Sequence, residues 1–379
     1  MANTKLSKPL LIIAGLGLLA GLYGVFEALV YRTEPTGLGS YVPWGLGVAL
    51  YLLFLGLSAG GLLVNCLVYI LGRKELDRIA GIVTYSTLLT EVCAGLAIAL
   101  DLGHWERMYR FIVSPSLTSP MFWMLIFFNA VLLVYAIKAL AIVTNNQPLA
   151  RLCSLVSIPV SLCFYATNGY FFSIITSHPA WSGAFTTIWF VLAALLSGGG
   201  LVTALAWFSQ DESEVTLRLG RTVALLLACF LIFEWLYFSV GYRGGRPDIA
   251  AALAAMLTGQ AAWSFWLLHL GLGLFLPLAL LLVGRNSPAA VAWAGLCIVA
   301  GFLAYRYAFV VAPQSVPMLP GLDKAWQDPR LTLTYTPTLG EWLLTLWVFS
   351  LGLAGFVVGP RLFPRLFPAG LAPTLGPMR

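Results

Sequence analysis

Charged residues are scarce in this sequence. Asp, Glu, Lys and Arg make up 9% of the 379 residues, whereas hydrophobic residues make up 60% and the mean hydropathy is +0.90. Because soluble domains carry about 25% charged residues, the composition excludes a soluble globular domain and predicts an integral membrane protein. The net charge of +6 comes from basic residues in short loops, which favours a role in membrane topology over nucleic-acid binding.

Histidine is rare, and cysteine is never clustered. Of the three histidines, only His269 falls clearly inside an apolar run, whereas a di-haem cytochrome b needs a pair of axial imidazoles for each haem. The six cysteines stand singly in apolar segments without a Cys-x-x-Cys motif, which argues against iron–sulfur or zinc ligation and favours buried packing. We therefore expect no haem and no iron–sulfur cluster in this chain.

Long apolar runs are abundant. A membrane-spanning helix needs about 20 mostly apolar residues, and strand-like alternation competes nowhere, so the predicted fold class is an all-α polytopic membrane protein. The sequence "TLGE" (338–341) has the spacing of a helix capping box. "GLSAG" (56–60) and "SGGGL" (197–201) predict close helix contacts. The ten predicted spans are 10–31, 45–71, 79–102, 120–143, 150–176, 184–208, 217–241, 260–283, 288–311 and 340–360.

Basic residues are distributed unequally between the two sides of these spans. The side that holds both termini has more Lys and Arg residues, Lys138 among them, than the opposite side. The positive-inside rule therefore predicts that both termini are cytoplasmic. The longer loops fall on the outer side, and they indicate either a docking surface for another subunit or unstructured connectors: 32–44, 103–119, 242–259 and 312–339.

Ionisable residues within the spans are few, and each is a functional candidate because charge at membrane depth is costly. Most are predicted in the outer half, with Glu91 and His269 near mid-membrane. This distribution predicts a site in the outer half and packing in the inner half. The candidates are Glu27, Glu91, Asp101, Glu234, His269 and Arg306, with Glu341 at the mouth of the tenth span.

The third span carries a polar stripe. Thr84, Thr87 and Glu91 share one helical face, and Asp101 lies about 15 Å further along the axis. The stripe could pass protons between mid-membrane and the outer surface. Alternatively, the Thr hydroxyls bond to backbone carbonyls and Glu91 stays protonated.

Polar and aromatic residues also meet near the outer ends of two other spans. Trp44 and Tyr51 open the second span, and Tyr165, Asn168 and Tyr170 lie near the end of the fifth. Trp44 alone is typical of an interfacial aromatic belt. Together with Asp101 and His104, these groups predict a pocket for a ring with two carbonyl oxygens, which would exchange protons with His or Asp.

Several motifs resemble one family. "DLGHWER" (101–107) resembles the Asp-Leu-Gly-Arg/His-Pro-x-Arg signature of NrfD/PsrC-type membrane subunits. "PWGLGVALYLLFLGLSAGG" (43–61) is similar to the family's opening core helix, and "FWLLHLGLGLFLPLALLL" (265–282) fits a later segment. The "YTPTLGEWLLTLWVFSLG" ending (335–352) is similar to the ten-span branch that includes HybB, DsrP and QrcD-like proteins.

The resemblance implies a haem-free, quinone- or quinol-reacting anchor subunit of a respiratory complex in a bacterial or archaeal cytoplasmic membrane. Its cofactor would be menaquinone or ubiquinone. Its partners would be an iron–sulfur subunit of the four-cluster ferredoxin-like type and a further catalytic or cytochrome subunit, both on the outer side. It also implies four units: a peripheral helix with its outer loop (1–44), a quinone-binding four-helix bundle (45–176), a second bundle (184–311), and the last loop, helix and tail (312–379).

The sequence departs from the family at two places. Tyr51 stands where some relatives have a quinone-contacting His, and Trp105 stands where Pro is usual. Carried over by position, Asp101 and His104 would lie at the mouth of the site. Arg107 would contact the quinone or, with Arg110, hold the loop.

The resulting hypothesis is that electrons pass between a bound quinone and the partner's cluster, while His104, Asp101 and Glu91 carry protons. Two alternatives stay open. A secondary transporter would have a site near the midplane and related internal repeats. A redox-coupled proton-translocating subunit would use Glu27, Glu234 and Arg306 as its path.

Overall fold

The computed structural model is built from α-helices with short 3-10 and π-helical segments, and it describes residues 4–208, 212–319, 321, 324, 328 and 331–367. Within these residues there is no β-strand, and ten helices are long and apolar enough to cross a membrane. The predicted all-α, ten-span membrane protein is confirmed. The tail beyond residue 367 and much of 320–330, assigned to the fourth predicted unit, lie outside the described residues.

The helices follow the apolar runs closely. Proline lies in the first turn of α6, α7 and α12, where its missing N–H costs nothing. The capping box predicted at 338–341 is present, with Thr338 and Glu341 bonding each other's backbone. The spans are α1 (Thr4–Val30), α2 (Leu46–Ser58) continued by α3 (Gly60–Asn65) and η1 (Cys66–Ile70), η2 (Lys74–Ile79) with α4 (Ala80–Asp101), α6 (Pro120–Val143), α7 (Gln147–Ser173), α8 (Ala184–Phe208), α9 (Ser213–Arg243), η4 (Ser264–Phe275) with α11 (Leu276–Val283), α12 (Pro288–Val311) and α14 (Leu339–Leu362).

Helix α2 is the centre of the molecule. Every one of its residues is buried, and it packs against α4, α8 and α12. Its continuation meets α8 backbone to backbone, because a side chain on Gly60 would lie 2.8 Å from the carbonyl oxygen of Gly198. Both glycine-rich motifs therefore lie at a close helix contact, as predicted, and they form it with each other. A helix buried all round explains why the second span has no polar face.

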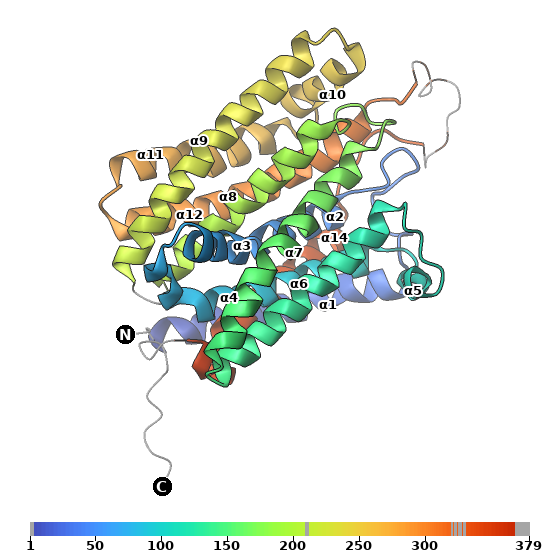
Figure 1. Cartoon of the computed structure of the whole chain (residues 1–379). Helices are drawn as coiled ribbons and strands as arrows, with labels where there is room; N and C mark the ends of the chain where they lie inside the picture. The colour runs from blue at the N-terminus through green and yellow to red at the C-terminus, as the bar shows by residue number, and fades with distance from the viewer. Residues whose placement is uncertain are drawn as a thin grey trace.

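The remaining spans pack around α2 in two groups. In the first, α2 and α3 contact α4 and α7, and α6 lies on α4 and α7; in the second, α8, α9, η4, α11 and α12 contact one another. The first and last spans pair with each other, and α14 joins that pair to α4. Figure 1 shows the α1–α14 pair along one flank, away from α9 and α11. Below, these sets are called the first group, the second group and the flanking pair.

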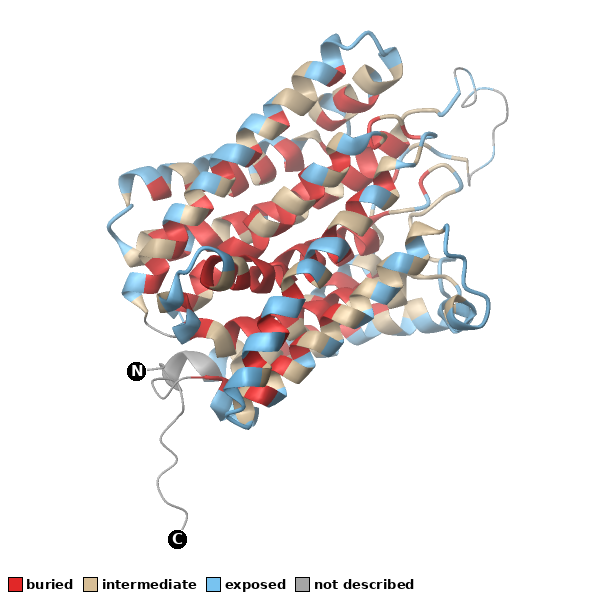
Figure 2. Ribbon diagram, in the orientation of Figure 1, coloured by how far each residue is buried: buried red, intermediate tan, exposed pale blue. Residues whose placement is uncertain are grey.

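The two ends of the molecule differ. Figure 1 shows the start of α1 and the end of α14 at one end, called here the termini side; the opposite end, the loop side, carries α5 (Arg110–Val113) and α10 (Pro247–Thr258). Figure 2 shows buried residues concentrated where the spans face one another and exposed residues at the loops and along outward faces. Those outward faces are apolar, as on α1 with Ile12, Leu16 and Leu19, which is the surface expected to meet lipid.

The loop-side connectors contain more structure than the sequence indicated. The stretch 242–259, predicted as a loop, contains α10 (Pro247–Thr258). Pro247 occupies its first turn, Asp248 adds an acidic residue there, and an Ala-rich run follows, so the local sequence favours a helix. It is too short to span a membrane, and it packs on η5 (Ala312–Ser315) and α9.

Candidate functional site

Tyr51 and Asn168 form a buried pair between α2 and α7. Tyr51 Oη donates to Asn168 Oδ1 at 2.7 Å, and Asn168 Nδ2 donates to the Phe164 carbonyl at 2.9 Å. The Asn168 amide is therefore held in one orientation, with its oxygen toward α2. The structure brings these two predicted site residues together.

Glu91 lies on α4 ten residues before Asp101, nearer the middle of the first group. It is fully buried, and neither carboxyl oxygen has a hydrogen-bond partner among the described residues. Nearby, Ser58 donates to the Leu55 carbonyl at 2.7 Å, so its oxygen can accept from Tyr165 Oη at 2.9 Å. A buried carboxyl group without a partner is costly, so Glu91 is a candidate for a functional role at this depth.

Asp101 ends α4 against the first turn of α2. Its carboxyl group lies directly over Gly47, where any side chain would collide with it. The glycine thus lets the carboxyl approach the α2 backbone. The same α2 turn is fixed from the loop side, since the amide of Leu46 donates to Tyr335 Oη at 2.9 Å and Tyr335 Oη donates to Glu341 Oε1 at 2.5 Å.

Trp44 belongs to an aromatic cluster between the two groups. Its ring stacks on Trp181 at 5.5 Å and contacts Phe171 and Phe172 at 5.6 and 5.7 Å. Its backbone is held on both sides by Gln314, which accepts from the Trp44 amide at 3.2 Å and donates to its carbonyl at 2.8 Å. Trp44 is therefore a fixed wall beside α2 as well as an aromatic residue near the membrane surface.

His104 lies in the exposed loop after α4. Its Nδ1 is 2.7 Å from Arg32 Nη1 and 2.9 Å from Glu106 Oε1, so it can accept from the arginine or donate to the carboxylate, but not both at once. The hydrogen bond from His104 lowers the pKa of Glu106. Arg107 in this loop and Tyr170 on α7 are exposed. These three predicted residues are exposed and are not buried with Tyr51.

A polar cluster at the termini side corrects the expectation of simple packing there. The sequence groups Lys138 with the basic residues of the predicted cytoplasmic side, but it is 2% exposed within α6. Its Nζ donates to Asn65 Oδ1 at 2.8 Å, while Asn65 Nδ2 donates to Ser157 Oγ at 2.7 Å and to Tyr135 Oη at 3.3 Å. The long aliphatic stem lets the ammonium group reach a polar partner between the helices.

This cluster approaches the polar stripe of α4 at Gly61. A side chain at Gly61 would collide with both Thr87 Oγ1 and Tyr135 Oη, so the two hydroxyls lie close together against the same glycine. Thr87 in turn donates to the Ser58 carbonyl at 3.3 Å. Polar groups therefore run from Tyr165 and Ser58 through Thr87 and Tyr135 to the cluster at Lys138. Thr84 differs, because its hydroxyl bonds to the carbonyl of Ala80 within its own helix.

The second group contains a separate buried cluster. His269 Nε2 lies 2.8 Å from Glu234 Oε1, and both residues are buried. The His269 ring is 4.8 Å from that of Tyr305. Arg306 is 1% exposed, its terminal nitrogens have no hydrogen-bond partner among the described residues, and its guanidinium lies 4.6 Å from the Phe190 ring. An aromatic face partly compensates a desolvated cation.

Glu27 does not join that cluster. It is half-buried on α1, and its carboxyl lies against Gly340 of α14. Of the three residues predicted as a proton path, Glu234 and Arg306 thus lie around Tyr305, whereas Glu27 belongs to the flanking pair.

Two cavities in the described part of the chain stand out, and neither is lined by Tyr51 or Asp101. One, of about 540 Å³, lies beside the second group and is lined by Glu234 together with aromatic side chains such as Trp235, Phe238 and Trp266. The other, of about 1050 Å³, lies at the termini side of the first group and includes Lys138. No group of three or more His, Cys, Asp or Glu residues in the described chain could hold a metal ion.

Residues 35–317, which include nearly all of these contacts, match a known family described as polysulphide reductase, NrfD. The chain belongs to the NrfD family. It is 24% identical to a selenate reductase subunit of Mesobacillus selenatarsenatis, over 90% of this chain and 89% of the relative. It is 26% identical to the Hdr-like menaquinol oxidoreductase integral membrane subunit of Archaeoglobus fulgidus, over 88% of each, and 22% identical to the menaquinone reductase integral membrane subunit of Nitratidesulfovibrio vulgaris, over 92% and 89%.

Several residues around the candidate site were not predicted from the sequence. Gln314, Trp181 and Arg32 reach Trp44 or His104 from distant parts of the chain, and no local motif marks them. Lys138 did carry a signal, because it stands inside the apolar run "AIKALAIV". However, Lys138 lies only about 8 Å along the axis from the end of α6. A side chain that extends to the membrane surface is therefore an equally good interpretation of the sequence.

Proposed function

We propose that this NrfD-family chain is the quinone-reactive, haem-free membrane subunit of a respiratory oxidoreductase. It would exchange electrons between menaquinone or ubiquinone and an iron–sulfur subunit docked on the loop side. The observation that carries the proposal is the buried Tyr51–Asn168 pair, with the Asp101 carboxyl of α4 against Gly47, one turn before Tyr51 on α2, and Trp44 as an aromatic wall. Two of the similar proteins are named for menaquinol or menaquinone.

The donor set fits a ring with two carbonyl oxygens. A bound quinone supplies chemistry in which two electrons and two protons are exchanged. Tyr51 would offer its hydroxyl to a ring oxygen in place of Asn168, and Asn168 would offer its amide. Asp101, close to the loop side, would exchange a proton with the ring oxygen and then with His104 or water. Glu91, buried without a partner, would hold a second proton on the inward side.

The loop side is the proposed docking face, and both termini would be cytoplasmic in a bacterial or archaeal inner membrane. The Arg32, His104 and Glu106 contacts give the loop after α4 a defined structure, which supports a recognition surface over an unstructured connector. An iron–sulfur subunit there would receive or deliver the electrons, and a further catalytic or cytochrome subunit would complete the complex. The first group would carry the quinone site, and Arg107 would contact the ring or the interface.

The test is Asp101→Asn in the complex purified with this chain, assayed for reaction with 2,3-dimethyl-1,4-naphthoquinol. Removal of a positioned proton-transfer group typically costs 10²–10⁴-fold in rate, so we expect at least about a 100-fold loss. Asp248→Asn is the matched control, since Asp248 is an exposed loop-side carboxylate paired with Arg246. Parental activity in Asp101→Asn would contradict the assignment.

The cavity beside Glu234 is an alternative location for the quinone, and the same assay can test it. Glu234→Gln keeps the side-chain shape and should leave quinol oxidation within about twofold of the parental rate if the site lies at Tyr51. A loss in Glu234→Gln with normal activity in Asp101→Asn would move the quinone site to the second group.

A second candidate function, redox-coupled proton translocation, is favoured by the polar groups that continue from Ser58 to Lys138. In this case a proton would cross most of the first group through Thr87, Tyr135 and Asn65. With the complex in sealed vesicles, proton uptake on the termini side during turnover would support this function. Uptake and release confined to the loop side would exclude it.

A further inference from the structure

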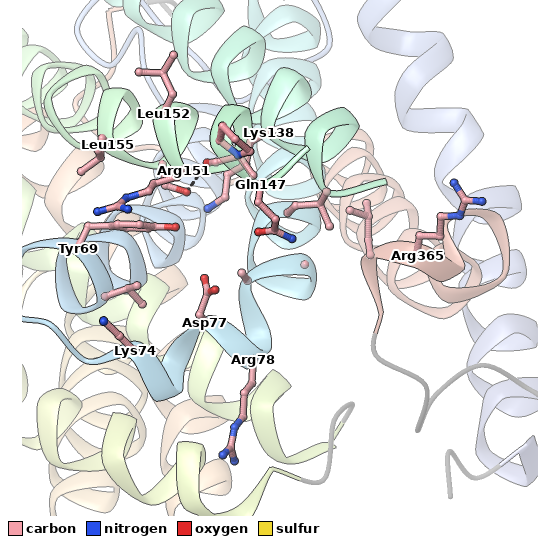
Figure 3. A pocket seen from close by; sticks show the side chains of 18 of the residues that line it. Tyr69, Lys74, Asp77, Arg78, Lys138, Gln147, Arg151, Leu152, Leu155 and Arg365 are labelled. Atoms are coloured by element: carbon pink, nitrogen blue, oxygen red, sulfur yellow. Dashed lines mark hydrogen bonds between the residues drawn. The ribbon is translucent and has the colours of Figure 1, made fainter. Parts of the chain in front are cut away.

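The large cavity on the termini side lies apart from the candidate quinone site. Its walls come from four parts of the chain: η1 with η2, the end of α6, the start of α7, and η6 (Pro364–Leu366). With about 1050 Å³ of space, it exceeds what packing defects leave in a protein interior. Figure 3 shows polar side chains entering it from several sides.

The charge of this cavity is strongly positive. Asp77 is its single acidic lining residue, against the basic residues Lys74, Arg78, Lys138, Arg151 and Arg365. Some of these cations already have partners: Lys138 bonds to Asn65, Arg365 donates to the Val143 carbonyl at 2.9 Å, and Arg78 lies 3.8–3.9 Å from Glu214 and Glu212.

Lys74 and Arg151 are the two cations left without a partner. Neither has an ion pair or a side-chain hydrogen bond with any residue of the described chain, and both are exposed. They belong to different walls of the cavity, η2 and α7, so an anion between them would join two segments that are separated in the sequence. In Figure 3 the labelled Arg151 and Lys74 side chains lie on the same side of the view, above and below the Tyr69 ring.

An apolar strip continues from the cationic rim along α7. Leu152 is 57% exposed and Leu155 is 44% exposed, and both also line the cavity. On a membrane-spanning helix such residues meet lipid tails. A ligand that contacts both the cationic residues and the apolar strip therefore has an anionic head and an apolar tail. A soluble phosphate has no apolar tail.

We propose that this cavity binds the phosphate headgroup of an anionic phospholipid from the leaflet on the termini side, between Lys74 and Arg151, with an acyl chain along Leu152 and Leu155. Basic pockets between membrane helices bind anionic headgroups in this way. The bound lipid would link η2 to the start of α7. It lies at the opposite end of the first group from Tyr51, so its test does not depend on quinone chemistry.

The test uses the full-length chain, purified and stripped of lipid in a neutral detergent, and titrated with phosphatidylglycerol. Binding is followed by native mass spectrometry and by the shift in Tm. We expect saturable binding of phosphatidylglycerol with a rise in Tm, and no saturable binding of phosphatidylcholine. Equal binding of the two lipids would overturn the proposal.

The variant is Lys74→Gln with Arg151→Gln. Since each basic residue near an anionic surface contributes roughly fivefold in affinity, the double variant should bind phosphatidylglycerol about 30-fold more weakly. Its lipid-free Tm should be unchanged, because both side chains are exposed. The matched control is Lys8→Gln with Arg285→Gln, which removes one Lys and one Arg from exposed positions on the same side. An equal loss in the control would overturn the proposal.

Two further experiments distinguish a bound lipid from a bound soluble anion. Leu152→Gln should weaken phosphatidylglycerol binding while leaving the Lys74 and Arg151 pair intact. Inorganic phosphate at millimolar concentration should neither raise Tm nor displace the lipid. Displacement by phosphate together with normal lipid binding in Leu152→Gln would assign the cavity to a soluble anion instead.

Discussion

Lys138 Nζ donates a 2.8 Å hydrogen bond to Asn65 Oδ1, at a point where both side chains are 2% exposed. The amide of Asn65 uses its other end for Ser157 and Tyr135, so all three groups depend on one residue for their bonds. Buried cations at membrane depth are kept where they have a function. This contact extends the polar interior of the first group well beyond the outer-half site.

A double-mutant cycle tests how strongly the two residues depend on each other. Asn65→Leu leaves a buried ammonium group without a partner and should lower the free energy of unfolding by about 3–5 kcal/mol. Lys138→Met leaves only a neutral amide oxygen unpaired, at about 1–3 kcal/mol. The double variant should therefore be more stable than Asn65→Leu alone. The measurement is equilibrium unfolding in detergent; single effects that simply add would show that the two side chains do not interact.

The hydroxyl of Tyr51 is predicted to matter for both stability and turnover. Tyr51→Phe leaves Asn168 Oδ1 buried without its donor, which should cost about 1–3 kcal/mol, and it should raise KM for the naphthoquinol about tenfold. Tyr85→Phe is the matched control, because Tyr85 Oη donates a similar 2.7 Å bond to Gly355 in the flanking pair. The measurement is KM for the naphthoquinol, from steady-state kinetics of the two variant complexes. Equal changes in KM would show that Tyr51 acts only through stability.

Much of the fold could be predicted because lipid leaves few alternatives. Every backbone polar group must be bonded within the span, so each long apolar run had to be a helix, and α8 begins and ends where predicted, at 184 and 208. Local signals also worked, as with the capping pair Thr338 and Glu341. The helix α10 was missed because its 12 residues fall below the length that the membrane criterion detects.

The candidate site was only partly predictable, since the sequence gives the depth of a residue but not the neighbours of its side chain. The pairing of Tyr51 with Asn168 followed from their similar depth. Gln314 fell in a predicted loop, yet it is 1% exposed and holds the Trp44 backbone. Glu27 shows the opposite case: its predicted depth is shared with Glu234, but the two belong to different sets of helices.

Acidification should loosen the loop that follows α4. The pKa of Glu106 is lower in the folded protein than in the unfolded chain, because His104 donates to it and Arg32 lies 3.4 Å away. A lowered carboxyl pKa stabilises the loop above the unfolded value, about 4.3, and that contribution is lost as the pH falls through the folded value. Hydrogen exchange of amides 103–109, corrected for intrinsic rates, should therefore increase below about pH 4. In Glu106→Gln the exchange should already be faster at neutral pH and should not change further on acidification; a parental response in this variant would assign the effect to another group.

The contact between Asp101 and Gly47 allows a test that leaves every ionisable group in place. Gly47→Ala adds one methyl group where the Asp101 carboxyl now lies, so the carboxyl must turn away from α2. Alanine is the better helix former by about 1 kcal/mol, so the variant is expected to fold. Because a displacement of about 1 Å can cost 100-fold in rate, we expect kcat/KM for the naphthoquinol to fall roughly 10–100-fold. Gly15→Ala on α1, where an added Cβ meets nothing within 4 Å, should leave it unchanged. Parental kinetics in Gly47→Ala, with Asp101→Asn still inactive, would show that the reaction needs the carboxyl group but not its position against α2.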